Sequence, residues 1–261
     1  MRTQFGSLML AAALTLSGNA SAQTATPPEK PTIVLVHGAF AESSSWDPVI
    51  SELARDGYRV IAAANPLRSV ATDAASVSAV VHSIKGPVVL VGHSYGGPVI
   101  TEAANGSANI KALVYVAAFA PDTGESAFML SGKFPGSTLG DALTQVALPD
   151  GNQDLYIQTD KFHAQFAADV PAAQAAEMAA TQRPVTLAAL QEPARNASWK
   201  TLPSYMIYGS ADRNIPAAAL KFMAERAHAR KTVVVQGASH VVMTSHPHEV
   251  VALIEDAASG K

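Results

Sequence analysis

Six short apolar runs rich in β-branched residues recur along the chain, and helix-like stretches separate them. The runs cover residues 32–36, 58–62, 87–91, 112–116, 204–208 and 232–235. Continuous apolar runs of this length suit strands buried on both faces of a parallel sheet. Strands that alternate with helices form βαβ units with right-handed crossovers. The sequence therefore predicts an α/β fold built on a mostly parallel, doubly wound sheet.

The interval between the fourth and fifth runs breaks this rhythm. Residues 121–200 contain no clear core strand; residues 121–155 are rich in Gly, Pro and Ser, and residues 171–191 are alanine-rich and helix-like. A long insertion in a compact domain usually has a function. We expect a lid or cap over a binding cleft, with Phe128 and Met129 binding substrate. The alternative is an insertion whose aromatic residues only pack locally.

The first 22 residues have the pattern of a signal peptide. Arg2 supplies a positive charge, residues 8–16 form an apolar stretch too short to span a bilayer, and residues 20–22 (ASA) match a cleavage site. Residues 23–30 read as a flexible leader, and residues 31–261 as one domain. We expect a periplasmic or secreted protein without a stable membrane anchor after cleavage; the alternative is an uncleaved N-terminal anchor.

The composition excludes several classes of protein. The chain has no cysteine, which rules out disulfide bonds, a cysteine nucleophile and a lipid anchor on cysteine. A formal net charge of −3, without a cluster of lysine and arginine, argues against nucleic acid as a partner. His246 and His248 form an H-x-H pair, but nothing completes a recognisable metal-binding spacing, so we expect no metal.

The third run ends in a G-x-S-x-G sequence, with Ser94 between Gly92 and Gly96. By itself the pattern is a weak signal. Here a predicted strand precedes it and a predicted helix follows, which is the context of a nucleophile elbow. The two glycines remove side chains that would collide in so tight a turn. We expect Ser94 to be a nucleophile raised above the end of the sheet.

A serine nucleophile needs a base, and the base needs an acid that orients it. His240 follows the last predicted strand and Asp212 follows the fifth, so both lie at carboxyl ends of strands, where ligands bind in open α/β sheets. Their order after the serine is the order that this architecture requires. Asp122 is the main alternative for the acid, and His246 for the base.

Two backbone amides are needed to hold a developing oxyanion. The N–H of Tyr95, at the start of the helix after the serine, is one candidate. The junction after the first strand, at His37-Gly38-Ala39-Phe40, supplies the other in such sites. We expect the amide of Ala39 to be this donor, with that of Phe40 as the alternative. The side chain of Phe40 is a further candidate for substrate binding.

Together these residues resemble the α/β-hydrolase superfamily. The resemblance covers residues 31–261 apart from the lid, and it rests on HGAF, GHSYGG and the Asp212 and His240 loops in the family order. The segments LVHGAF, GHSYGG and SHVVMTSHP are most similar to bacterial esterase-like members related to plant methyl esterases and hydroxynitrile lyases. The resemblance implies a Ser-His-Asp triad, no cofactor and a mobile cap.

The resemblance also bears on the reaction. The lyase relatives carry a lysine directly after the catalytic histidine, and this chain has Val241 there, which argues against cyanohydrin cleavage. We expect a carboxylesterase-like serine hydrolase that cleaves a small or medium apolar carboxylic ester through an acyl-enzyme. Alternatives on the same residues are C–C bond hydrolysis, perhydrolysis as in cofactor-free haloperoxidases, and a lyase reaction. A ligand-binding protein with an inactive triad is the alternative from another class.

Overall fold

The computed structural model describes residues 1, 3 and 29–261. The predicted signal peptide and leader therefore lie, apart from residues 1, 3, 29 and 30, outside the described residues. Within the part of the chain that is described, no helix combines the length and the apolar character needed to cross a membrane.

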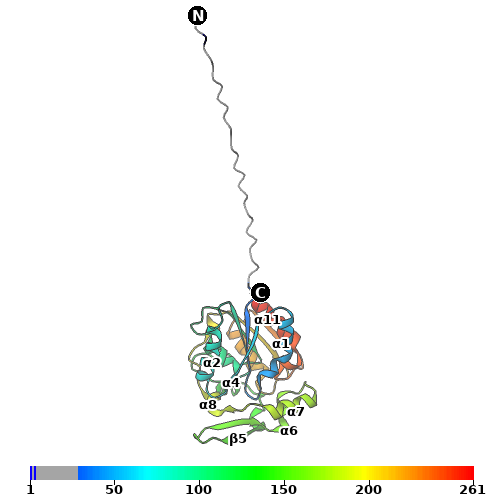
Figure 1. The fold of residues 1–261 in the computed structure, drawn as a ribbon. Helices are drawn as coiled ribbons and strands as arrows, with labels where there is room; N and C mark the ends of the chain where they lie inside the picture. The colour runs from blue at the N-terminus through cyan, green and yellow to red at the C-terminus, as the bar shows by residue number, and fades with distance from the viewer. Residues whose placement is uncertain (2, 4–28) are drawn as a thin grey trace.

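A six-stranded sheet forms the centre of the molecule, in the order β2-β1-β3-β4-β8-β9 (Figure 1). Its strands are β1 (Thr32–Val36), β2 (Val60–Ala63), β3 (Val88–His93), β4 (Ile110–Val116), β8 (Ser204–Gly209) and β9 (Lys231–Val235). Every neighbouring pair is parallel, so all carboxyl ends lie at one edge of the sheet. The predicted mostly parallel α/β fold is confirmed, and each predicted run matches a strand to within two residues at either end.

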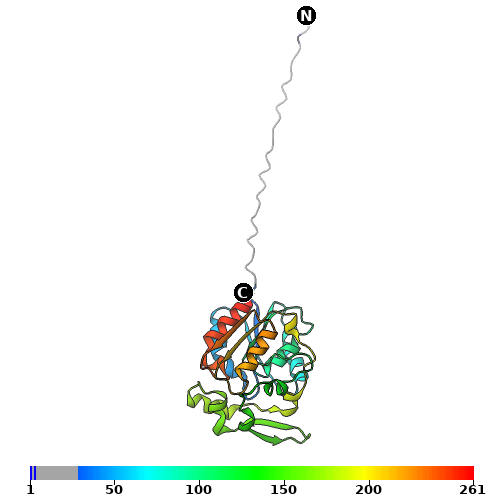
Figure 2. The same ribbon diagram turned by 180° about the vertical axis from the view of Figure 1, so that it is seen from behind.

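Helices cover both faces of this sheet. The helix α1 (Asp47–Arg55) packs against α11 (Pro247–Ser259), and α2 (Val70–His82) packs against α3 (Gly96–Ala103) on the opposite side (Figures 1 and 2). The helix α9 (Ala217–Arg226) contacts β8. All residues of β1 and β3 are consequently buried, whereas β9, at an edge of the sheet, is partly exposed. The continuous apolar runs reflect this double coverage.

Residues 121–200, here called the 121–200 segment, lie at one end of the sheet, as both views show through β5, α6 and α7 (Figures 1 and 2). The segment contains no strand of the central sheet, as predicted, but it has a small antiparallel sheet of its own. Its elements are α4 (Ala127–Ser131), α5 (Leu139–Ala142), β5 (Leu143–Ala147), β6 (Gln153–Ile157), α6 (Thr159–Phe166), α7 (Ala172–Thr181), β7 (Val185–Thr186), α8 (Leu187–Gln191) and η2 (Ser198–Lys200).

The alanine-rich stretch 171–191 is not one helix. The helix α7 ends at Thr181, and β7 separates it from α8. Pro184 stands between them, and a proline disfavours helical backbone at the residue before it, which explains the interruption. Two further short helices, η1 (Ser43–Trp46) and α10 (Val242–Ser245), flank the loops at the carboxyl edge of the sheet.

Candidate active site

Ser94 occupies the sharp corner between β3 and α3. Its φ angle is +52°, in the left-handed region that a residue with a side chain adopts only under strain. Backbone hydrogen bonds hold it there: its N–H donates to Val116 O (3.2 Å), and its carbonyl accepts from the N–H of Gly97 (3.0 Å) and of Phe119 (3.3 Å). The strained corner is therefore fixed by β4, α3 and the loop after β4.

The glycines on either side of the corner are required by close approach. A Cβ atom on Gly92 would lie 2.6 Å from Gly96 O, and one on Gly96 would lie 2.6 Å from Val36 O. Both neighbours are backbone atoms, which cannot rotate away. The motif thus allows β1, β3 and the start of α3 to meet directly beneath the serine.

Asp212 and His240 follow β8 and β9, and their side chains are joined by a hydrogen bond of 2.7 Å from His240 Nδ1 to Asp212 Oδ2. The other carboxylate oxygen, Oδ1, accepts from the N–H of Asn214 (2.8 Å) and of Ile215 (3.0 Å). The side chains of the pair are 1% and 0% exposed. The carboxylate is thus oriented by the loop, and it orients the imidazole in turn.

The imidazole of His240 lies beside the serine corner. The ring of His93, the residue before Ser94, packs on it with centroids 4.8 Å apart, and Phe166 packs at 5.2 Å. His93 Nε2–H donates to the carbonyl of His240 (3.2 Å). Burial holds the pKa of His93 well below its usual value, so this ring is neutral. His240 Nε2 is buried and has no hydrogen-bond partner among the described residues.

The two oxyanion candidates after β1 differ in what their amides contact. The N–H of Phe40 donates to the carbonyl of Arg183 at 2.9 Å, so it is not available to a ligand. The amides of Ala39 and Tyr95 donate to no group within residues 29–261. Both residues line the same cavity as Ser94. The geometry therefore favours Ala39 over Phe40.

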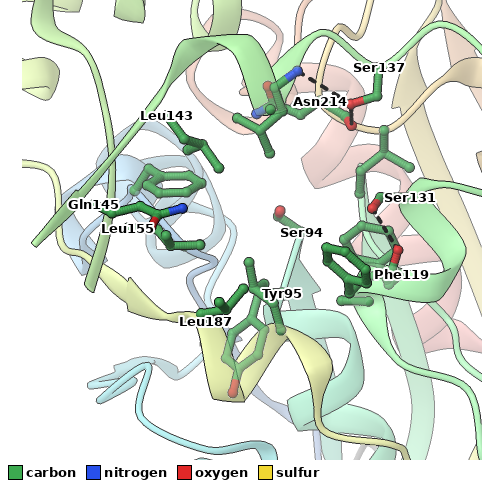
Figure 3. A pocket seen from close by; sticks show the side chains of 18 residues that line it. Ser94, Tyr95, Phe119, Ser131, Ser137, Leu143, Gln145, Leu155, Leu187 and Asn214 are labelled. Carbon is green, nitrogen blue, oxygen red and sulfur yellow. Dashed lines mark hydrogen bonds between the residues drawn. The ribbon is translucent and has the colours of Figure 1, made fainter. Parts of the chain in front are cut away.

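A cavity of about 290 Å³ opens in front of Ser94, whose hydroxyl points into it between side chains of the sheet edge and of the 121–200 segment (Figure 3). Phe40 and Phe128, two of the residues that the sequence suggests for substrate binding, line this cavity. Met129 does not; its side chain is on the surface and 58% exposed. Sequence reasoning did not identify several apolar lining residues, namely Phe119, Leu143, Leu155, Leu187 and Ile215.

The competing candidates lie elsewhere and have other partners. Asp122 forms an ion pair with Lys200 (2.5 Å) on the surface, and this hydrogen bond lowers the pKa of its carboxyl group. His246 Nδ1 lies 3.5 Å from Asp169 Oδ2. His248 pairs with a glutamate of α1. Among the described residues, no three potential ligands come together as a metal site.

A parallel α/β sheet with a strained serine corner and a buried Asp–His pair at its carboxyl edge defines an α/β hydrolase. The chain belongs to the alpha/beta hydrolase family, whose profile matches residues 33–253, and the resemblance seen in the sequence is thereby confirmed.

Three relatives illustrate the range of the family. The alpha/beta hydrolase nvfD of Aspergillus novofumigatus (strain IBT 16806) is 26% identical over 253 residues, which cover 88% of this chain and 97% of the relative. The structure of polyneuridine aldehyde esterase superimposes with a TM-score of 0.77 at 20% identity, over 87% of this chain and 99% of the esterase. The methylesterase MES16 from Arabidopsis gives 0.75 at 17% identity, over 88% and 100%. These structures show the shared fold.

Proposed function

We propose that the protein hydrolyses small or medium apolar carboxylic esters, with Ser94 as nucleophile, His240 as base and Asp212 as the orienting acid. The observation that carries this proposal is the state of the His240 ring. Its Nδ1 donates to Asp212, so in the neutral imidazole Nε2 has no proton and is an acceptor. That acceptor is buried and unpaired next to the Ser94 corner.

In the proposed reaction, Ser94 Oγ attacks the ester carbonyl while His240 Nε2 takes the hydroxyl proton. The amides of Tyr95 and Ala39 donate to the oxyanion of the tetrahedral intermediate. The intermediate collapses, and the leaving alkoxide takes the proton from His240. Water then attacks the acyl-enzyme with His240 again as base, which releases the acid and restores Ser94.

The hydroxyl of Ser94 makes no hydrogen bond to His240 Nε2 in this structure. In sites of this kind without substrate, catalytic hydrogen bonds are often long and shorten when substrate binds. The apolar lining supports an apolar acyl or alcohol group, with Phe40 and Phe128 in contact with it. The names of two structural relatives, an aldehyde esterase and a methylesterase, are consistent with ester chemistry.

The test is the Ser94→Ala variant, assayed on 4-nitrophenyl butyrate and with a fluorophosphonate probe. We expect kcat to fall by roughly 10³-fold or more and labelling to disappear. Ser83→Ala is the matched control, because Ser83 is exposed and its hydroxyl bonds only to its own helix turn. Turnover or labelling of Ser94→Ala at the level of Ser83→Ala would refute the proposal.

A further inference from the structure

Asn214 places a carboxamide in the wall of the cavity in front of Ser94 (Figure 3). The residue is 3% exposed. Its main-chain N–H supports Asp212, as described above, but its side chain has no part in that contact. A buried amide in a mostly apolar wall needs hydrogen-bond partners for both its oxygen and its nitrogen.

The orientation of this amide follows from its neighbours. Gln165, on α6, lies 2.9 Å from the carbonyl of Arg213; a carbonyl only accepts, so the atom of Gln165 at that position is Nε2. The same Nε2 lies 2.8 Å from the Asn214 side chain, which must therefore present Oδ1. Gln165 Oε1 accepts from the hydroxyl of Thr138 (2.8 Å), which completes the assignment.

The nitrogen of the Asn214 amide is left with two N–H groups to donate. Nδ2 makes no hydrogen bond within residues 29–261 and keeps some accessible surface, and Asn214 is one of the residues that line the cavity. The hydroxyl of Ser137 donates to Asn214 O, and that of Ser131 to Phe128 O (each 2.9 Å; Figure 3). Apart from the proposed nucleophile Ser94, Asn214 is thus the buried side chain of this cavity whose donors make no hydrogen bond to the described residues.

We propose that Asn214 Nδ2 is a specificity determinant that donates a hydrogen bond to an oxygen of the substrate remote from the scissile carbonyl. This inference rests on the proposed ester hydrolysis, and it narrows the substrate class to apolar esters with one further acceptor, such as keto esters. A bound substrate covers Nδ2 and displaces water from it, and a donor buried without a partner is unfavourable, so a ligand oxygen placed there is selected over a methylene.

The test uses aliphatic esters in which one keto oxygen is placed at successive carbons of the acyl or the alcohol chain. Each is paired with the ester that lacks this oxygen, and hydrolysis is followed by proton release. For each pair we define the selectivity as kcat/KM of the keto ester divided by kcat/KM of its parent. At one position of the keto oxygen, we expect the selectivity of the wild type to be about tenfold higher than that of Asn214→Leu. Equal selectivities at every position would overturn the inference.

Two controls separate this inference from the proposed function. Asn105→Leu makes the same change at an exposed position of the α3–β4 connection, and it should keep the wild-type selectivity. Binding of the uncleaved esters by Ser94→Ala and by Ser94→Ala/Asn214→Leu, measured by calorimetry, repeats the comparison without turnover. A keto preference that depends on Asn214 supports the inference even if hydrolysis is absent. A Kd for the keto esters no lower than for their parents in Ser94→Ala refutes it, even if hydrolysis is present.

Discussion

Replacing Asp212 by asparagine isolates the electronic role of the proposed acid, because the two side chains have almost the same shape. In the structure both carboxylate oxygens accept: Oδ2 from His240 Nδ1 at 2.7 Å, and Oδ1 from the N–H groups of Asn214 and Ile215 at 2.8 and 3.0 Å. An asparagine has only one oxygen, so it can serve one of these two sides.

The structure decides which side the single oxygen takes. If it faced His240, the new NH₂ group would confront the N–H donors of Asn214 and Ile215, and each buried donor left unpaired costs about 1–3 kcal/mol. The oxygen therefore stays with the backbone, and the NH₂ group faces His240 Nδ1. The ring must then accept at Nδ1 and carry its proton on Nε2, where it cannot take the proton of Ser94.

The expected loss in kcat is roughly 10⁴-fold, about 5.5 kcal/mol in the barrier, as for the wrong tautomer in serine proteases. The assay is hydrolysis of a nitrophenyl ester near neutral pH, with thermal unfolding as a check on folding. Asp122→Asn is the control: it makes the same change in a surface ion pair with Lys200, and such a pair contributes about 0–1 kcal/mol to stability. The kcat of this variant should stay within about twofold of the wild-type value. Equal effects of the two variants would refute the assignment of the acid.

Two further substitutions test the oxyanion donor and the buried imidazole. Ala39→Pro removes one N–H and should lower kcat by about 10²–10³-fold. Thermal unfolding checks that the variant is still folded at the assay temperature. An unchanged kcat would exclude this amide as a donor. Burial lowers the pKa of His93, so below about pH 6.5 the unfolded chain binds a proton that the folded chain does not. The free energy of unfolding therefore decreases as the pH is lowered. Between about pH 7.5 and 5.5, His93→Phe should therefore lose about 1 kcal/mol less unfolding free energy than wild type in urea titrations, and equal losses would contradict the sign.

The central sheet could be predicted from the sequence because helices cover both of its faces. That coverage makes β1 and β3 apolar at every position, which is a strong local signal. The strands of the 121–200 segment carry no such signal: β5 is largely exposed, and β7 has only two residues. Their pairing depends on contacts between distant parts of the chain, which no local pattern records.

The residues of the proposed triad were found for a similar reason, since each follows a predicted strand and parallel strands end at one edge. The wall of the cavity follows no such rule. Phe128 lines it and its neighbour Met129 does not, because consecutive residues of α4 point about 100° apart and the facing side depends on how the helix packs. The sequence favours Ala39 over Phe40 as the oxyanion donor, but only the contact between the N–H of Phe40 and Arg183, a residue far along the chain, argues against the alternative.

Asn214 has one role that follows from its position in the chain and another that depends on a distant residue. Its main-chain N–H holds Asp212, a role that depends only on its position two residues further along the loop. The direction of its side chain depends on Gln165, which the 121–200 segment brings from another part of the chain. Leucine at position 214 keeps the main-chain N–H, and it removes both the side-chain donor Nδ2 and the oxygen Oδ1 that accepts from Gln165. A change in the choice of ester caused by that substitution would therefore arise in the cavity wall, and not through the support of Asp212.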